Sequence, residues 1–170
     1  MGQFVVRIDD PEAPDVRALL DTHLAFARHH SLPEDVHALD INGLLSGSVS
    51  VFSIREDDEL VGVGALKQLD EFQAELKSMH TAEAARGRGA GRAMVDHLVA
   101  IERARGCHRV NLETGSGAAF APARALYFSA GFEICGPFAE YGPSPNRVCM
   151  TLELAPRHPP DAESTQIAPP

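Results

Sequence analysis

Short runs of alternating apolar and polar residues recur along the chain and are separated by longer runs with helical spacing. Residues 4–8 alternate and predict a first strand. Asp9-Asp10-Pro11 predicts a turn, and Asp15 marks the start of a helix. That helix is predicted by apolar residues at helical spacing, namely Val16, Leu19, Leu20, Leu24 and Ala27. Residues 29–47 have no clear period, so we expect a second short helix with loops there.

The rest of the chain predicts a hairpin followed by alternating strands and helices. Residues 49–55 and 60–69 are rich in β-forming residues and flank the polar turn 56–59, which predicts the hairpin. A helix with Met94, Leu98 and Ile101 on one face should end at Arg105, because Gly106 suits the residue that follows a helix. Further elements are expected as strands at 75–81, 109–113, 132–135 and 147–154 and as a helix at 122–130. The tail, 155–170, has little to bury and is expected to be disordered.

Composition narrows the class of protein. A chain of 170 residues can form one domain, expected at 1–154, that buries about 70% of its unfolded surface. No apolar run reaches the ~20 residues that span a bilayer, and no signal-peptide pattern is seen, so we expect a cytoplasmic protein without membrane contact. The net charge of −9 argues against nucleic-acid binding. Cys107, Cys135 and Cys149 lack the spacing of a disulfide framework or zinc site and are expected to be reduced and buried.

A glycine-rich segment between the strand at 75–81 and the following helix carries the main chemical signal. It reads Arg86-Gly87-Arg88-Gly89-Ala90-Gly91-Arg92. Unobstructed backbone N–H groups, a helix N-terminus and three arginines predict a site for a polyphosphate. The segment matches neither the P-loop pattern nor the dinucleotide pattern G-x-G-x-x-G, because Arg92 stands where the last glycine would be.

Two motifs resemble those of one known family. Residues 86–91 read as R-x-x-G-x-G, and residues 123–132 read as A-x-x-L-Y-x-x-x-G-F. In this order, with a strand between them, they resemble the GNAT superfamily of acetyl-CoA-dependent N-acetyltransferases, and the resemblance covers residues 7–154. It implies an α/β (α+β) fold with a mixed, mostly antiparallel sheet of about six to seven strands and about four helices. It also implies transfer of an acetyl group from acetyl-CoA to a primary amine of a small molecule or peptide.

The resemblance assigns roles to the groups that direct attack of an amine on a thioester requires. Glu75 matches the general base of the histone-acetyltransferase branch, the backbone amide of Met79 matches the oxyanion donor, and Tyr127 matches the acid for the leaving thiolate. The strand with Met79 and Thr81 is expected to splay from its neighbour and bind the pantetheine arm. The pyrophosphate is expected on Arg86, Gly87, Arg88, Gly89, Ala90, Gly91 and Arg92.

The roles of three side chains have alternatives. Glu75 could be an exposed strand carboxylate paired with Lys77, which would leave water or Glu113 as the base. Tyr127 could lie at a helix surface. Phe120 replaces an asparagine that contacts the cofactor in many family members, and it could pack the cofactor or close the substrate pocket.

Contacts to the acceptor are expected from the segments that border this site in the family. The candidates are His37, Asp40, Glu113 and Tyr141. Glu113 could hold a substrate amine or simply face Arg109. The histidines lack the spacing of a zinc site, so no metal is expected. The sequence leaves open the identity of the amine, a homodimer, and two other functions: a non-catalytic acyl-CoA sensor and a module that binds ATP or NAD.

Overall fold

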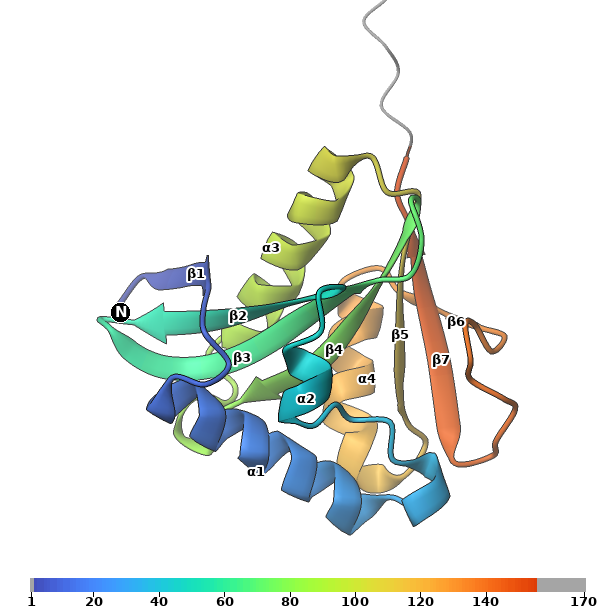
Figure 1. The fold of residues 1–170 in the computed structure, drawn as a ribbon, viewed down its shortest axis with the longest axis horizontal. Helices are drawn as coiled ribbons and strands as arrows, with labels where there is room; N and C mark the ends of the chain where they lie inside the picture. Colours follow the sequence, from blue (N-terminus) through green and yellow to red (C-terminus); the bar gives the residue numbers. More distant parts are fainter. Residues whose placement is uncertain (1, 156–170) are drawn as a thin grey trace, which may run out of the picture.

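The computed structural model describes residues 2–155 as one mixed sheet of seven strands with helices on both faces (Figure 1). The strands are β1 (Phe4–Ile8), β2 (Val49–Glu56), β3 (Glu59–Gln68), β4 (Gln73–Thr81), β5 (Arg109–Gly115), β6 (Glu133–Cys135) and β7 (Arg147–Glu153). Their order across the sheet is β1-β2-β3-β4-β5-β7-β6. Only β4 and β5 run parallel, so the predicted mixed, mostly antiparallel sheet is confirmed.

Helices cover the two faces of the sheet and enclose two separate apolar cores. They are α1 (Pro14–His30), α2 (Ile41–Leu44), α3 (Ala90–Arg105) and α4 (Ala121–Ser129). The smaller core joins α1 and α2 to the strand residues Val51, Val63 and Ala65. The larger core joins α3 and α4 to the strand residues Phe52, Ile54, Leu66, Leu76, Val110, Leu112 and Met150. Because successive side chains on a strand point to opposite faces, one sheet serves both cores.

The predicted elements are present with boundaries shifted by one or two residues. Gly106 has a φ of 85° and ends α3 as predicted. The segment 29–47 contains a 3-10 turn (Pro33–Asp35) and the short α2. No helix within residues 2–155 is both long and apolar enough to cross a membrane. Apart from Ala155, the tail that was expected to be disordered lies outside the described residues.

The three cysteines are free thiols, as expected. Cys107 and Cys149 are buried, but Cys135 is partly exposed. The prediction of burial is wrong for Cys135 because β6, which contains it, forms the outer edge of the sheet.

The two parallel strands separate at their C-terminal ends. Their paired residues run only from Gln73↔Arg109 to Leu76↔Leu112. Beyond this point β4 continues to Thr81, and Figure 1 shows β4 and β5 diverging. The predicted splay is confirmed, and it leaves one edge of β4 without a strand partner in the described structure.

Candidate active site

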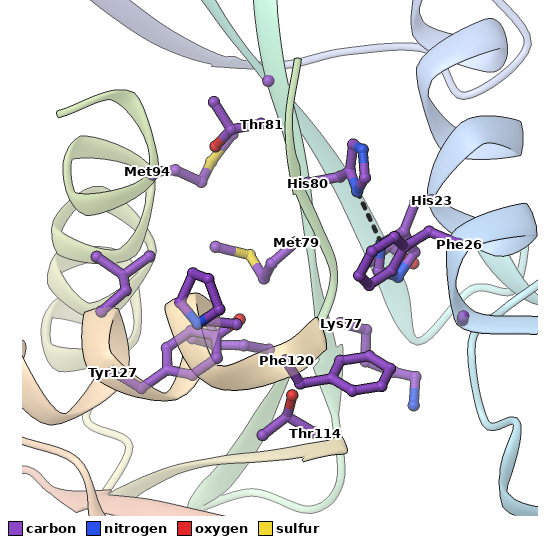
Figure 2. Close-up of a pocket in the computed structure, with 18 of the residues that line it drawn as sticks. His23, Phe26, Lys77, Met79, His80, Thr81, Met94, Thr114, Phe120 and Tyr127 are labelled. Atoms are coloured by element: carbon purple, nitrogen blue, oxygen red, sulfur yellow. Dashed lines mark hydrogen bonds between the residues drawn. The ribbon is translucent and has the colours of Figure 1, made fainter. Parts of the chain in front are cut away.

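A cavity of about 630 Å³ occupies the opening between β4 and β5. One part of it, here named the loop half, is lined by the glycine-rich loop and α4. The other part, the α1 half, is lined by α1 and residues 35–38. Figure 2 shows Met79 directed toward α3 and α4, and His80 directed toward α1. A single cavity of ligand size therefore joins the two faces of the sheet.

A β-bulge in β4 directs side chains into the two halves. The register between β3 and β4 shifts so that Gly64 alone faces both Ser78 and Met79. Ser78 takes the extra position, with a left-handed φ of 52°. In a regular strand Lys77 and Met79 would lie on the same face. The extra residue instead sends Met79 into the core with α3, whereas Lys77 stays on the α1 side.

The glycine-rich loop has the backbone geometry of an anion site. Gly87 and Gly89 have φ values of 72° and 94°, which glycine adopts readily. Gly89 is also the N-cap of α3 and leaves the first N–H groups of this helix without a side-chain cap. A Cβ atom built at residue 87 would meet nothing within 4 Å, so the space next to the loop backbone there is open. The N–H groups and the positive end of the helix dipole therefore face a space suited to a phosphate.

Two of the three predicted arginines face this space. Arg86 and Arg92 line the cavity, and Arg92 donates to the carbonyl of Ser129 on α4 at 2.9 Å. Arg88 instead forms an ion pair with Glu56 on β2 and is not among the lining residues. The side chain of Arg88 therefore lies away from the cavity, because the loop turns it toward a neighbouring strand.

Glu75 lies in the α1 half, and only 2% of its surface is exposed. Lys77 Nζ lies 3.2 Å from Glu75 Oε1 and 2.7 Å from the Tyr141 hydroxyl, which itself donates to Glu75 Oε1. The expected pairing with Lys77 is thus present, but the exposed position is wrong because α1 packs over β4. Burial and the Glu75 carboxylate raise the pKa of Tyr141, which keeps its hydroxyl a donor. Both contacts converge on Oε1, and Oε2 is the oxygen left for a ligand.

Glu113 faces Arg147 and not Arg109. Arg147 Nε lies 3.5 Å from Glu113 Oε1, whereas Arg109 pairs with Glu153 at 2.8 Å. Arg109 and Glu113 are four residues apart on β5, or about 13 Å at the rise of a strand, too far for an ion pair. Burial raises the pKa of Glu113, while Lys77 and Arg147 lower it. Glu113 lines the cavity, as expected of an acceptor contact.

Arg147 also ties residues 35–37 to the sheet. Its Nη2 lies 2.6 Å from His37 Nε2 and 3.5 Å from Asp35 Oδ1. A guanidinium only donates, so His37 Nε2 accepts this hydrogen bond. Burial and the Arg147 charge lower the pKa of His37. Hydrogen bonds from Asn146 and Ser144 hold the pKa of Asp35 low. Both His37, which was predicted, and Asp35, which was not, line the α1 half.

Two predicted acceptor contacts lie off the cavity wall. Asp40 accepts a hydrogen bond from the Gly43 N–H at 2.9 Å and caps α2. Asp40 takes this place because a carboxylate directly before a helix satisfies the free N–H groups there. Tyr141 is not a lining residue either, but it contacts three residues that are, namely Glu75, Lys77 and His37.

Tyr127 lies on α4, and only 6% of its surface is exposed. Its ring packs against Phe132 with centroids 5.9 Å apart, and it lines the cavity (Figure 2). The alternative of a tyrosine at a helix surface is therefore wrong. Burial raises the pKa of the Tyr127 hydroxyl, so this group remains protonated at neutral pH and available as a donor.

Three aromatic residues on the wall of the α1 half escaped prediction. His23 Nδ1 lies 3.4 Å from His80 Nδ1, and the rings of Phe26 and His80 are 6.1 Å apart. Burial lowers the pKa of His23 to about 4 and also lowers that of His80, so both are neutral at pH 7. His23 shares the helical spacing of the buried face of α1, which is a usable signal. The bulge that directs His80 has no comparable signal in the sequence.

Comparisons with known proteins point in one direction. Residues 15–132 match the profile of the acetyltransferase (GNAT) family. The chain is 42% identical over 149 residues to the uncharacterized N-acetyltransferase YsnE of Bacillus subtilis (strain 168), a match that covers 88% of this chain and 99% of that protein.

Solved structures share the fold. A Klebsiella pneumoniae protein, proposed to be an acyl-CoA N-acyltransferase, is 28% identical with a TM-score of 0.73, over 90% of this chain and 99% of that one. A Bacillus subtilis acetyltransferase in complex with CoA is 16% identical with a TM-score of 0.69, over 90% and 100% of the two chains.

Proposed function

Because this chain belongs to the acetyltransferase (GNAT) family, we propose that it transfers the acetyl group of acetyl-CoA to a primary amine of a small molecule or peptide. The observation that carries the proposal is the single cavity between β4 and β5, with the open glycine-rich loop in one half and the carboxylates of Glu75 and Glu113 in the other. Because acetyl donor and amine can enter from opposite faces, the amine attacks the thioester directly, without a covalent acetyl-enzyme.

The loop half suits coenzyme A. Backbone N–H groups of residues 87–91 would hold the pyrophosphate together with Arg86 and Arg92, and the unpaired edge of β4 from Met79 to Thr81 would hold the pantetheine arm. The CoA complex of the Bacillus subtilis fold neighbour supports coenzyme A as the ligand. When bound, acetyl-CoA supplies an acetyl group activated as a thioester.

Glu75 is the proposed base. Its Oε2 is free of the contacts made by Lys77 and Tyr141, and the carboxylate lines the cavity. A base within reach of the ammonium group is required because only the neutral amine has a lone pair for attack.

Met79 and Tyr127 would complete the transfer. The Met79 amide donates to the carbonyl oxygen as negative charge develops on it. The C–N bond forms, the C–S bond breaks, and the Tyr127 hydroxyl protonates the departing thiolate. Starting from an ammonium ion, the products are an amide and a free thiol, with one net proton released to solvent. The position of Tyr127 on the wall of the loop half supports this role.

The test is release of free CoA thiol from acetyl-CoA in the presence of an amine panel, with product mass confirmed. The expected result is amine-dependent release with intersecting initial-velocity lines. Parallel lines, or an acetylated protein after incubation without amine, would contradict direct attack. Tight acetyl-CoA binding without turnover of any amine would instead support the sensor alternative.

A further inference from the structure

Aromatic side chains cover the α1 half of the cavity. Phe26 on α1 and Phe120 in the 3-10 turn Ala118–Phe120 meet edge to face with centroids 5.4 Å apart. His30 extends the group, with its ring 4.5 Å from Phe26 and 6.4 Å from Phe120. Phe26 and Phe120 both line the cavity (Figure 2). The two rings bridge α1 and the segment after β5, and they form an apolar wall.

Gly115 at the end of β5 holds Phe120 in this position. A Cβ at residue 115 would lie 2.3 to 2.8 Å from three ring atoms of Phe120, so any side chain there would displace the ring. The Phe120 ring therefore rests directly on the strand backbone. Its contact with Phe26 favours closure of the substrate pocket over packing against the cofactor.

The polar wall of the same half carries an excess of negative charge. Asp35, Glu75 and Glu113 line it as carboxylates, and Lys77 lines it as a cation. Lys77 already pairs with Glu75, and Arg147 behind the wall faces Asp35 and Glu113 at 3.5 Å each. Three carboxylates thus face two cations, both of which are engaged. The loop half, by contrast, presents Arg86 and Arg92.

This charge distribution discriminates between amines. An ammonium group is attracted by the excess carboxylate, and the low dielectric of a half-closed cavity strengthens the attraction. A free amino acid would bring its own carboxylate into the same wall. There the carboxylate would face Asp35, Glu75 and Glu113, while Lys77 and Arg147 are already paired.

We propose that the acceptor is an arylalkylamine: a primary amine joined by a short chain to an aromatic ring, with no carboxylate beside the amine. The ring lies against Phe26 and Phe120, and the amine points toward Glu75 and the opening between β4 and β5. Edge-to-face contacts favour a ring over an alkyl group of equal size. The inference rests on the proposed acetyltransferase function and names the substrate class of the same site.

The test compares acceptors that differ in one feature. Phenethylamine, L-phenylalanine and L-phenylalaninamide share a skeleton but differ in the carboxylate, and propylamine lacks the ring. We expect kcat/KM for phenethylamine to exceed that for L-phenylalanine and propylamine by at least about tenfold. L-Phenylalaninamide, in which a neutral amide replaces the carboxylate, should have a kcat/KM close to that of phenethylamine.

The outcomes separate this inference from the proposed function. Preferred turnover of L-phenylalanine, propylamine or spermidine would overturn the arylalkylamine assignment and leave the acetyltransferase function intact. Acetyl-CoA binding without turnover of any of these amines would overturn the proposed function and the inference with it.

Variants of the apolar wall test the ring site itself. Phe120→Ala should raise KM for phenethylamine by about tenfold and leave KM for propylamine nearly unchanged. Phe128→Ala is the matched control, because the ring of Phe128 on α4 is exposed and lies outside the cavity. It should change neither KM value. An equal rise of both KM values in Phe120→Ala would overturn the ring site. Unchanged acetyl-CoA affinity by calorimetry would verify that the variant is folded.

The polar wall is tested by Glu113→Gln, which removes one carboxylate. The preference for phenethylamine over L-phenylalanine should narrow severalfold in this variant. An unchanged preference would show that the acidic wall does not select against a carboxylate.

Discussion

At the residue scale, the hydroxyl of Tyr127 can be removed without changing the packing around it. Tyr127→Phe keeps the ring packed against Phe132 and removes only the proton donor. We predict that kcat falls roughly 10²-fold if protonation of the thiolate limits the rate, while acetyl-CoA affinity and Tm stay the same. Single-turnover kinetics measure this step. A wild-type rate under chemistry-limited conditions would assign the proton to water or another group.

Glu75→Gln removes the proposed base but also leaves Lys77 as a buried cation without its carboxylate partner. We predict that kcat/KM falls at neutral pH and recovers partly at higher pH, where more of the acceptor amine is already deprotonated. The variant should also lose about 3 kcal/mol of unfolding free energy, because breaking a buried ion pair strands one charge. The pH–rate profile and urea denaturation measure the two effects.

A double variant separates these effects. Glu75→Gln with Lys77→Gln leaves no unpaired charge and should regain part of the lost stability without regaining the rate. Should the double variant recover both, the charge imbalance and not the missing base explains the loss. In that case the proton leaves through water or Glu113.

At the scale of elements, the two ends of α3 provide a matched pair of glycines. Gly89 and Gly106 flank this helix with φ values of 94° and 85°. Gly89→Asp places a carboxylate where phosphate oxygens should approach the first N–H groups. We predict at least about tenfold weaker acetyl-CoA binding by calorimetry, or about 1.4 kcal/mol.

Gly106→Asp is the control, because it introduces the same strained residue at the opposite end of the same helix. It should cost at least as much stability as Gly89→Asp, because a carboxylate is unfavourable at the negative end of the helix dipole, and its effect on acetyl-CoA affinity should be small. Equal affinity losses in the two variants would mean that helix strain, and not the lost anion site, weakens binding.

At the scale of the whole molecule, partly buried histidines link stability to pH. Burial lowers the pKa of His23 to about 4 and also lowers those of His37 and His80, from an ordinary value near 6.5. As the pH falls below about 6.5, the unfolded chain takes up these protons first, so stability falls between about pH 6.5 and pH 4. Glu113 opposes this trend, because its raised pKa lets the folded protein bind a proton first. Because the three histidines destabilise the folded protein in acid and Glu113 alone opposes them among these four groups, we predict a net loss of stability in acid.

Urea denaturation near pH 7.5 and near pH 5 measures this loss. His23→Gln should lose less stability between the two conditions than the wild type. His29→Gln, an exposed position on the same helix, should behave as the wild type does. Equal losses in all three proteins would show that the histidine pair of His23 and His80 does not set the acid sensitivity.

Much of the fold and half of the site could be predicted from local patterns. Hydrophobic periodicity located the strands, α1 and α3, because burial of one face imposes its period on the sequence. The glycine-rich segment predicted the open loop before α3, because glycine readily adopts the positive φ values found at residues 87 and 89. The position of Tyr127 on the cavity wall followed from the contiguous motif at residues 123–132, and that of Glu75 from the family resemblance.

Contacts between distant segments were decided only by the tertiary structure. Glu113 meets Arg147 because β5 pairs with β7. Phe120 meets Phe26 because the splay of β4 and β5 brings α1 and the segment after β5 together. The bulge at Ser78 likewise depends on pairing with β3. A sequence pattern reports the burial of neighbours within a few residues. Which remote side chain completes an ion pair or an apolar wall depends on the packing of whole elements. The sequence therefore predicted Glu75, Glu113 and His37 in the α1 half one by one, but their partners and the wall of Phe26 and Phe120 could be inferred only from the folded chain.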